Sequence, residues 1–293
     1  MPHKNLGNRT TDNNSESITL IASDGYPIKA TFYSAQQTVG NIVIASATGV
    51  PQQFYRRFAK YASSQGFSTL TFDYRGIGKS KPLSLLGFKA DFFDWAYLDL
   101  AAAIDYMSNR SIPLFMVGHS FGGHAFGLLP NHHKVSRCYF YATGAGWHGW
   151  MPFVESLRVR LLWNVVLPIL IKWKGYAPFS MLGMGEDLPL DVYKQWRHWC
   201  RFPHYFFDDP KVSSDLLKKY AEVTTPIIAA NALDDLWAQP KSRNAFVEAY
   251  KNAPLECVNI DPSLYSGGIG HIGYFRSKAH PLWDNMLHWF REH

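Results

Sequence analysis

One pentapeptide of the sequence has the residue types and spacing of a catalytic nucleophile. Gly118, Ser120 and Gly122 form the pattern G-x-S-x-G, between an apolar run at 112–117 and a segment with helical spacing. A serine on a sharp strand-to-helix turn is strained and exposed, and the flanking glycines let neighbouring backbones pass. The backbone N–H of Phe121, at the head of the helix, can point at a developing oxyanion. The pattern therefore predicts acyl-transfer chemistry at Ser120.

Three fixed letters also occur by chance, so the surrounding elements decide the weight of this pattern. After residue 50, short β-rich runs alternate with segments of helical spacing, which predicts an α/β fold: a mostly parallel central sheet with helices on both faces. We expect a hairpin at 17–23 and 27–34, strands at 41–47, 67–73, 112–118, 135–142, 226–232 and 255–260, and helices at 52–64, 94–108, 121–129, 241–251 and 281–291. Ligands of such sheets bind beyond the carboxyl ends of the strands, where Ser120 falls.

One stretch interrupts the alternation. Residues 147–219 contain no convincing strand, several prolines and six of the ten tryptophans, which predicts a helical lid inserted over the sheet. The chain then divides into a flexible N-terminal segment at 1–16, a core at 17–146 and 220–293, and the lid at 147–219. So much aromatic surface predicts the wall of an apolar acyl pocket. For any single tryptophan, packing of the lid onto the sheet is the more typical role.

The composition excludes several classes of protein. Of the 293 residues 47% are apolar and 18% are charged, which suits a folded chain with a large core. The formal net charge is +6, but Lys and Arg form only short clusters, so we expect no nucleic-acid partner. Cys138, Cys200 and Cys257 share no metal-ligand spacing, and we expect neither a disulfide framework, a metal nor a cofactor. The polar N-terminus lacks the apolar core of a secretory signal and predicts a cytoplasmic location.

The most apolar run, at 161–171, is interrupted by Asn164 and flanked by Arg158, Arg160, Lys172 and Lys174. A transmembrane helix needs about 20 residues, so this run predicts no transmembrane segment. A run with basic flanks is also typical of a segment that rests on a membrane surface. We favour packing within the lid and keep contact with a membrane surface as the second interpretation.

From residue 18 onward the chain resembles the α/β-hydrolase superfamily. The stretches ASATGVP (45–51), FDYRGIGKS (72–80) and GHSFGG (118–123) carry this likeness. Within the superfamily the chain is most similar to bacterial predicted hydrolases related to the serine aminopeptidase and monoacylglycerol lipase type. The second stretch has neither G-x-G-x-x-G nor a P-loop pattern, and the resemblance implies a structural turn there instead of a nucleotide site.

The resemblance implies that a histidine late in the chain activates Ser120. Members of this fold place the nucleophile, the acid and the histidine in that chain order. His271 follows the expected strand at 255–260 and lies in a Gly-rich loop, as the superfamily's catalytic histidine does. His280, His288 and His293 border the closing helix, lie in it or end the chain, which suits capping, packing or exposure.

The acid of the triad should follow the strand at 226–232, where Asp234 and Asp235 stand together. Related hydrolases carry an Asp followed three residues later by a small apolar residue near a proline. Ala238 has this spacing from Asp235, which favours Asp235, with Asp234 kept as the alternative. For whichever aspartate is not the acid, we expect a loop carboxylate that caps the next helix.

A second oxyanion donor is expected from the loop after the strand at 41–47. Many relatives have His-Gly there, where this chain has Thr48 and Gly49, so the backbone N–H of Val50 is the candidate donor beside that of Phe121. Thr48 is equally consistent with an ordinary turn residue.

The resemblance predicts a serine hydrolase that cleaves an ester-type acyl bond, of the carboxylesterase or lipase kind, on a small and apolar acyl substrate. An acyltransferase or thioesterase on the same triad, and a non-catalytic ligand-binding protein of this fold, are the alternatives. Carboxylic esters, thioesters, lactones and peptides share the chemistry at Ser120, and the sequence indicates no oligomeric state.

Overall fold

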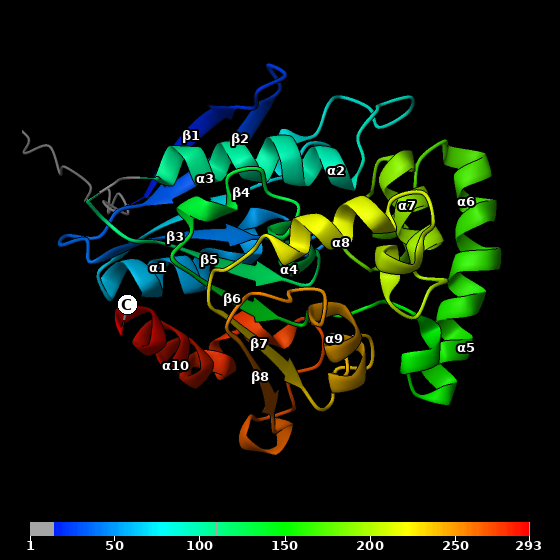
Figure 1. Cartoon of the computed structure of the whole chain (residues 1–293). Helices are drawn as coiled ribbons and strands as arrows, with labels where there is room; N and C mark the ends of the chain where they lie inside the picture. Colours follow the sequence, from blue (N-terminus) through cyan, green and yellow to red (C-terminus); the bar gives the residue numbers. More distant parts are fainter. Residues whose placement is uncertain (1–14, 109–110, 293) are drawn as a thin grey trace, which may run out of the picture.

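The computed structural model describes residues 15–108 and 111–292, and it is built on one eight-stranded sheet (Figure 1). The strands are β1 (Ser15–Ile21), β2 (Pro27–Tyr33), β3 (Gly40–Ala45), β4 (Phe67–Phe72), β5 (Leu114–His119), β6 (Arg137–Tyr141), β7 (Ile227–Ala232) and β8 (Leu255–Ile260). Their order is β1-β2-β4-β3-β5-β6-β7-β8. β2 is antiparallel to β1 and β4, and every later pairing is parallel. The predicted mostly parallel sheet is therefore confirmed.

The predicted N-terminal segment lies largely outside the described residues. Its last two members, Ser15 and Glu16, begin β1 and pair with β2. The opening hairpin thus starts two residues earlier than the sequence pattern indicated.

Helices cover both faces of the sheet, as predicted. They are α1 (Arg56–Ser64), α2 (Phe92–Asp94), α3 (Ala101–Met107), α4 (Phe121–Phe126), α5 (Phe153–Leu161), α6 (Leu167–Lys174), α7 (Leu190–Trp199), α8 (Ser213–Ala221), α9 (Pro240–Val247) and α10 (His280–Arg291). A π-helical turn, Trp95–Leu100, joins α2 to α3, and a second, Leu162–Val166, joins α5 to α6. A 3-10 turn, Gln52–Tyr55, leads into α1.

The strands in the middle of the sheet, such as β3, are buried on both sides because each side faces its own core. In β3, Ile42 and Ile44 join the core under α1 and α10. Val43 and Ala45 of the same strand join the core under α3, α4, α8 and α9. This alternation explains why residues 42–45 of β3 form a continuous apolar run rather than the in-out pattern of a half-exposed strand.

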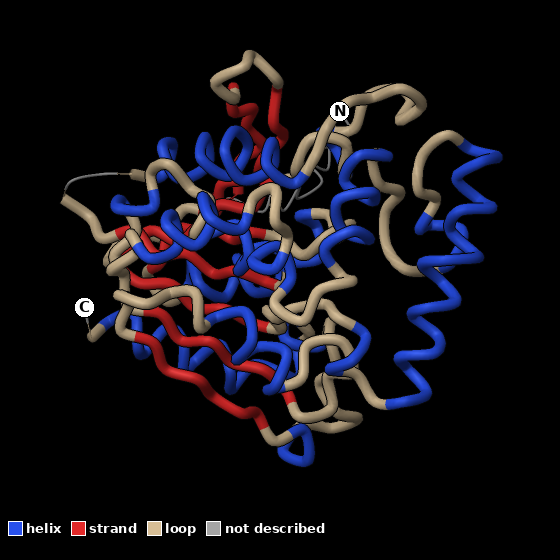
Figure 2. The backbone as a smooth tube through the Cα atoms, turned by 45° about the vertical axis from the view of Figure 1, so that its right-hand side comes forward, coloured by secondary structure: helices blue, strands red, loops and turns tan. Residues whose placement is uncertain are grey.

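The insertion lies at the carboxyl ends of the parallel strands, with α5, α6 and α7 beyond the tips of the arrows in Figure 1. Figure 2 shows the long helix of the insertion standing apart from the red strands. The last helix of the insertion, α8, packs instead on the core. The Tyr220 hydroxyl donates to the carbonyl oxygen of His124 in α4, and the Tyr220 ring fills the space that a Cβ on Gly127 would need. α8 therefore packs on the core, and the predicted boundary between insertion and core, at residues 219 and 220, falls inside this helix.

The turn after β4 is held by a buried ionic network, which agrees with the structural role expected for the stretch at 72–80. Arg75 donates to Asp99 at 2.7–2.8 Å and to Asp24 at 2.6 Å, and the Asp99 side chain is fully buried. Trp95 Nε1 donates to the carbonyl oxygen of Arg75. The network ties the turn to the helix α2–α3 that covers this face of the sheet.

Among the helices of the described residues, none has both the length and the apolar character needed to cross a membrane.

Candidate active site

Ser120 lies on the sharp turn between β5 and α4, with φ 52° and ψ −111°. Its N–H donates to the carbonyl oxygen of Tyr141 at 2.8 Å, which holds this strained residue in place. A Cβ on Gly122 would lie 2.0 Å from the carbonyl oxygen of Ala45, and one on Gly118 would lie 2.6 Å from a backbone nitrogen of α4. The two glycines of G-x-S-x-G are therefore required by the close approach of β3, β5 and α4.

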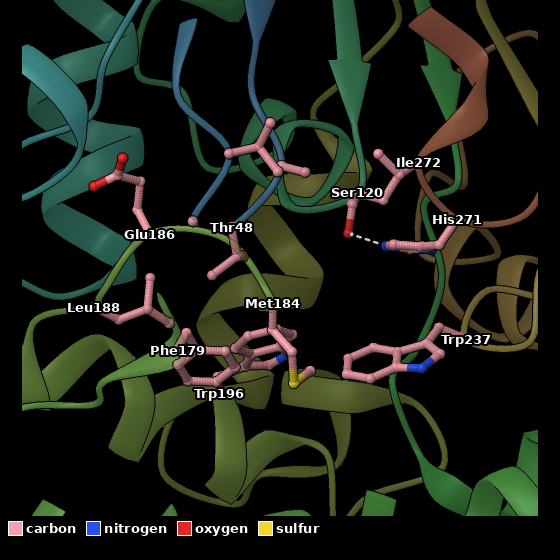
Figure 3. Close-up of a pocket in the computed structure, with 13 residues that line it drawn as sticks. Thr48, Ser120, Phe179, Met184, Glu186, Leu188, Trp196, Trp237, His271 and Ile272 are labelled. Atoms are coloured by element: carbon pink, nitrogen blue, oxygen red, sulfur yellow. Dashed lines mark hydrogen bonds between the residues drawn. The ribbon is translucent and has the colours of Figure 1, made fainter. Parts of the chain in front are cut away.

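The structure brings Ser120, His271 and Asp235 into one hydrogen-bonded row, of which Figure 3 shows the bond between Ser120 and His271. His271 Nε2 lies 3.1 Å from Ser120 Oγ, and His271 Nδ1 lies 2.9 Å from Asp235 Oδ2. When Nδ1 donates to the carboxylate, Nε2 of a neutral ring is left as an acceptor for the serine proton. This is the geometry of a nucleophile with its base and the group that orients the base.

The Asp235 carboxylate is completely buried and accepts several hydrogen bonds. The backbone N–H groups of Trp237 and Ala238 each donate to Oδ1 at 2.9 Å, beside the bond from His271. Burial raises the pKa of this carboxyl, but the His271 ring and the backbone donors outweigh it, so the pKa lies below its usual value. The bond from Ala238 gives a physical reason for the spacing of three residues that favoured Asp235.

Asp234 faces the other way and holds the Gly-rich loop that carries His271. Its carboxylate accepts from the N–H of Ile269 at 2.8 Å and from the N–H of Gly270 at 3.0 Å. The same carboxylate fills the space that a Cβ on Gly268 would need. Asp234 was expected to cap the next helix, and it instead binds the backbone of a loop 35 residues later in the chain. The residues near Asp234 in the sequence give no indication of this contact.

The two candidate oxyanion donors differ in their surroundings. Phe121 is the first residue of α4, so its N–H has no acceptor within the helix. The N–H of Val50 donates to the carbonyl oxygen of Ala47 at 3.1 Å, in the turn that contains Gly49 at φ 71°. Phe121 is therefore free to bind an oxyanion, whereas Val50 has to share its proton with Ala47.

A buried chain of hydrogen bonds links the turn after β3 to the loop that carries His271. This chain of bonds was not predicted from the sequence. His119 Nε2 lies 2.9 Å from the carbonyl oxygen of His271, so this nitrogen carries the proton and donates. Burial and the nearby His271 ring lower the pKa of His119 to about 3, and its Nδ1 accepts from the Tyr55 hydroxyl at 2.8 Å. Tyr55 Oη accepts in turn from the N–H of Ala47 at 2.9 Å. The residue beside the nucleophile thus connects the two loops that flank it.

A cavity of about 260 Å³ opens in front of Ser120. Figure 3 shows the mainly apolar wall that faces Ser120. The insertion supplies Phe179, Met184, Leu188 and Trp196, and Trp237 lies next to His271. Glu186 is the only carboxylate among the described residues that line the cavity.

The charge of Glu186 is directed away from the cavity. Figure 3 shows its carboxylate turned outward, and it lies 3.8 Å from Lys81 Nζ. Its backbone N–H donates to the carbonyl oxygen of Gly49 at 2.8 Å, which joins the insertion to the turn after β3. The space beside Ser120 is therefore suited to an uncharged group.

Within residues 15–108 and 111–292 there is no cluster of three or more His, Cys, Asp or Glu side chains that could hold a metal ion.

Known hydrolases are similar to this chain in sequence. Residues 36–173 match the family model described as "Serine aminopeptidase, S33". The monoglyceride lipase of Saccharomyces cerevisiae is 21% identical, over 93% of this chain and 91% of the lipase.

Solved structures show the same fold at low sequence identity. A soluble variant of the Saccharomyces cerevisiae monoglyceride lipase, in complex with a substrate analogue, has a TM-score of 0.70 at 17% identity and covers 97% of each chain. An esterase of Pyrococcus furiosus has a TM-score of 0.64 at 13% identity, over 99% of this chain and 96% of the esterase. The chain is a hydrolase of the α/β-hydrolase fold, and its sequence is similar to the serine aminopeptidase family over residues 36–173 and to a monoglyceride lipase over 93% of its length.

Proposed function

We propose that this hydrolase is a serine esterase that cleaves uncharged esters with an apolar acyl group. The observation that carries the proposal is the row Ser120, His271 and Asp235, with separations of 3.1 and 2.9 Å, at one end of a mainly apolar cavity. A serine hydroxyl is protonated at neutral pH, and a base within hydrogen-bond reach is what makes it a nucleophile.

In the proposed reaction Ser120 Oγ attacks the ester carbonyl while His271 Nε2 takes the serine proton. The negative charge that develops on the carbonyl oxygen is bound by the N–H of Phe121, together with that of Val50 when it shares its turn bond. His271 then protonates the leaving alcohol, which gives an acyl-enzyme on Ser120. Water attacks this acyl group by the same steps in reverse, and Asp235 stabilises the charged ring in both halves.

Labelling with a fluorophosphonate tests the nucleophile. The intact protein should be modified at Ser120, and Ser120→Ala should not be labelled. Ser64→Ala is a matched control, because Ser64 is an exposed serine of α1 remote from the cavity. Absence of labelling, or equal labelling of Ser120→Ala, would show that the assignment is wrong.

Turnover of p-nitrophenyl esters tests the reaction and its acyl preference. Each methylene that enters an apolar pocket gains about 0.8 kcal/mol, so kcat/KM should rise from acetyl to hexanoyl. Succinylated analogues should be poor substrates, since an unpaired charge is costly to bury. A flat or falling series, or better turnover of the succinyl ester, would contradict an apolar acyl site. Labelling without turnover would point to a different acyl acceptor, as in an acyltransferase.

A further inference from the structure

Residues 153–174 form one continuous helical rod, because a π-helical turn joins α5 to α6 without a break. Both Figures 1 and 2 place this rod at the outer edge of the molecule, beyond the strand ends. Two apolar rows run along it at a spacing of four residues, on opposite sides. The inner row consists of Val159, Trp163, Leu167 and Ile171. The outer row, which we call the outer stripe, consists of Phe153, Leu157, Leu161, Val165, Ile169 and Trp173.

The inner row accounts for the attachment of the rod to the protein. Val159 and Leu167 are buried, and the Trp163 ring lies 4.9 Å from that of Trp196, which lines the cavity in front of Ser120. The rod is therefore one layer behind the wall of the cavity. The fold needs no contact from the opposite side of the rod.

The outer stripe is left uncovered by the described chain. Its six side chains are between 47% and 78% exposed, although each is a large apolar group. Single exposed apolar residues are ordinary, but an unbroken row along a helix marks a surface that binds something. At 1.5 Å per residue the rod is roughly 30 Å long, and the surface of a helix is a convex ridge and not a groove.

The exposed charges of the rod are all positive. Arg158, Arg160 and Lys172 are exposed, and Lys174 Nζ lies 4.2 Å from the centre of the Trp173 ring. The only acidic residue between 153 and 174 is Glu155. Its side chain is 10% exposed and accepts from Trp237 Nε1 at 2.8 Å and from Arg158 at 3.1 Å. An apolar ridge flanked by cations complements a layer of acyl chains beneath anionic headgroups.

We propose that the outer stripe docks this hydrolase on the surface of an anionic lipid bilayer, with the rod lying in the plane of the interface. For the apolar run at 161–171 the sequence pattern favoured packing within the lid and kept contact with a membrane surface as the second interpretation. The structure assigns packing to the inner row and membrane contact to the outer stripe. The inner row links the docked face to the cavity wall through Trp196. The inference goes beyond the proposed function, since it concerns the surface on which the enzyme works and not the bond that it cleaves.

Co-sedimentation with vesicles of phosphatidylcholine, with and without 30% phosphatidylglycerol, tests the proposal. The wild-type protein should bind the anionic vesicles, and added salt should weaken binding. The triple variant Leu157→Ser, Leu161→Ser and Ile169→Ser should lower the partition coefficient by about 100-fold. The pair Arg160→Gln and Lys172→Gln should lower it by about 30-fold on anionic vesicles and leave any binding to neutral vesicles unchanged.

The matched control is the triple variant Ile21→Ser, Val39→Ser and Leu264→Ser, whose side chains are 64%, 53% and 76% exposed elsewhere on the molecule. It should bind vesicles as the wild type does. All these variants should keep wild-type turnover of a soluble acetyl ester, which shows that they fold. Ser120→Ala should lose turnover and keep vesicle binding, so failure of the proposed reaction is distinguishable from failure of docking.

Three results would overturn the proposal. The first is a wild-type protein that stays in solution with anionic vesicles, and the second is equal loss of binding in the stripe and control variants. The third is a wild-type dimer that the stripe variant converts to a monomer, without vesicle binding by either. That third result would assign the outer stripe to a second copy of the chain.

Discussion

Removal of the Tyr55 hydroxyl is the sharpest perturbation of the buried chain beside the nucleophile. Tyr55→Phe keeps the ring, which packs in the core, and deletes the one atom that joins the N–H of Ala47 to Nδ1 of His119. Each buried polar group left without its partner costs about 1–3 kcal/mol, so two of them should lower the free energy of unfolding by about 3 kcal/mol. At this chain length the loss corresponds to a fall in Tm of about 8 °C.

The same change should affect catalysis, because the two ends of the chain of bonds flank Ser120. Ala47 begins the turn that carries Val50, and His119 holds the carbonyl oxygen of His271. A small displacement of either loop misaligns reacting groups, so kcat should fall by about 10- to 100-fold while KM changes little.

Urea denaturation and ester kinetics measure the two effects on one protein. Tyr106→Phe is the control, since Tyr106 is 51% exposed and loss of its hydroxyl should change stability by less than about 0.5 kcal/mol. A Tyr55→Phe protein with wild-type stability would refute the assigned hydrogen bonds. A destabilised protein with unchanged kcat would refute their role in positioning the loops.

Three further predictions concern other buried charged or polar groups. Asp235→Asn should lower kcat by about 10⁴-fold with little change in KM. Asp234→Asn should lower Tm and reduce kcat far less. Equal losses of kcat in ester assays would contradict the different contacts of the two aspartates. Arg75→Met should destabilise the protein by about 3–5 kcal/mol in urea denaturation by leaving Asp99 buried without its partner, and adding Asp99→Leu should restore part of this loss. Burial lowers the pKa of His124 to about 4 from 6.5, so between these pH values the folded state binds fewer protons than the unfolded state. The free energy of unfolding should therefore fall by about 1.4 kcal/mol per pH unit from pH 6.5 toward 4. His124→Leu should remove this part of the pH dependence, and an unchanged slope would contradict a neutral His124.

The sheet could be predicted from the sequence because its determinants are local. The inner parallel strands are buried runs bounded by turn residues, as in β5. The edge strand β8 is more exposed and still has the predicted bounds, 255–260. The predicted boundary between lid and core, at residues 219 and 220, falls inside α8, and the contact that packs this helix on the core joins Tyr220 to His124 across 96 residues. Helical spacing identifies a helix but not the surface against which it packs.

In the candidate site, too, residues held by local contacts could be predicted from the sequence and residues held by distant contacts could not. Ser120 is recognisable because the elbow imposes glycines within two residues of it, and Asp235 because Ala238 donates to its carboxylate three residues later. Asp234 binds the backbone of a loop 35 residues away, where any residue other than proline supplies the same donor. A carboxylate that binds backbone groups leaves no pattern in the side chains of its partner.

The rod shows why the apolar run at 161–171 had two interpretations. Rows at a spacing of four residues are apolar on both of its sides, so the sequence contains no amphipathic contrast from which a buried side could be chosen. Burial of Val159 and Leu167 and the packing of Trp163 on Trp196 distinguish the inner row, and these contacts depend on the fold of the whole insertion. A helix that is apolar all round is ordinarily buried all round. Because Leu161 and Ile169 are instead 56% and 64% exposed, the apolar character of the outer stripe is not explained by folding and is best explained by a partner outside the chain.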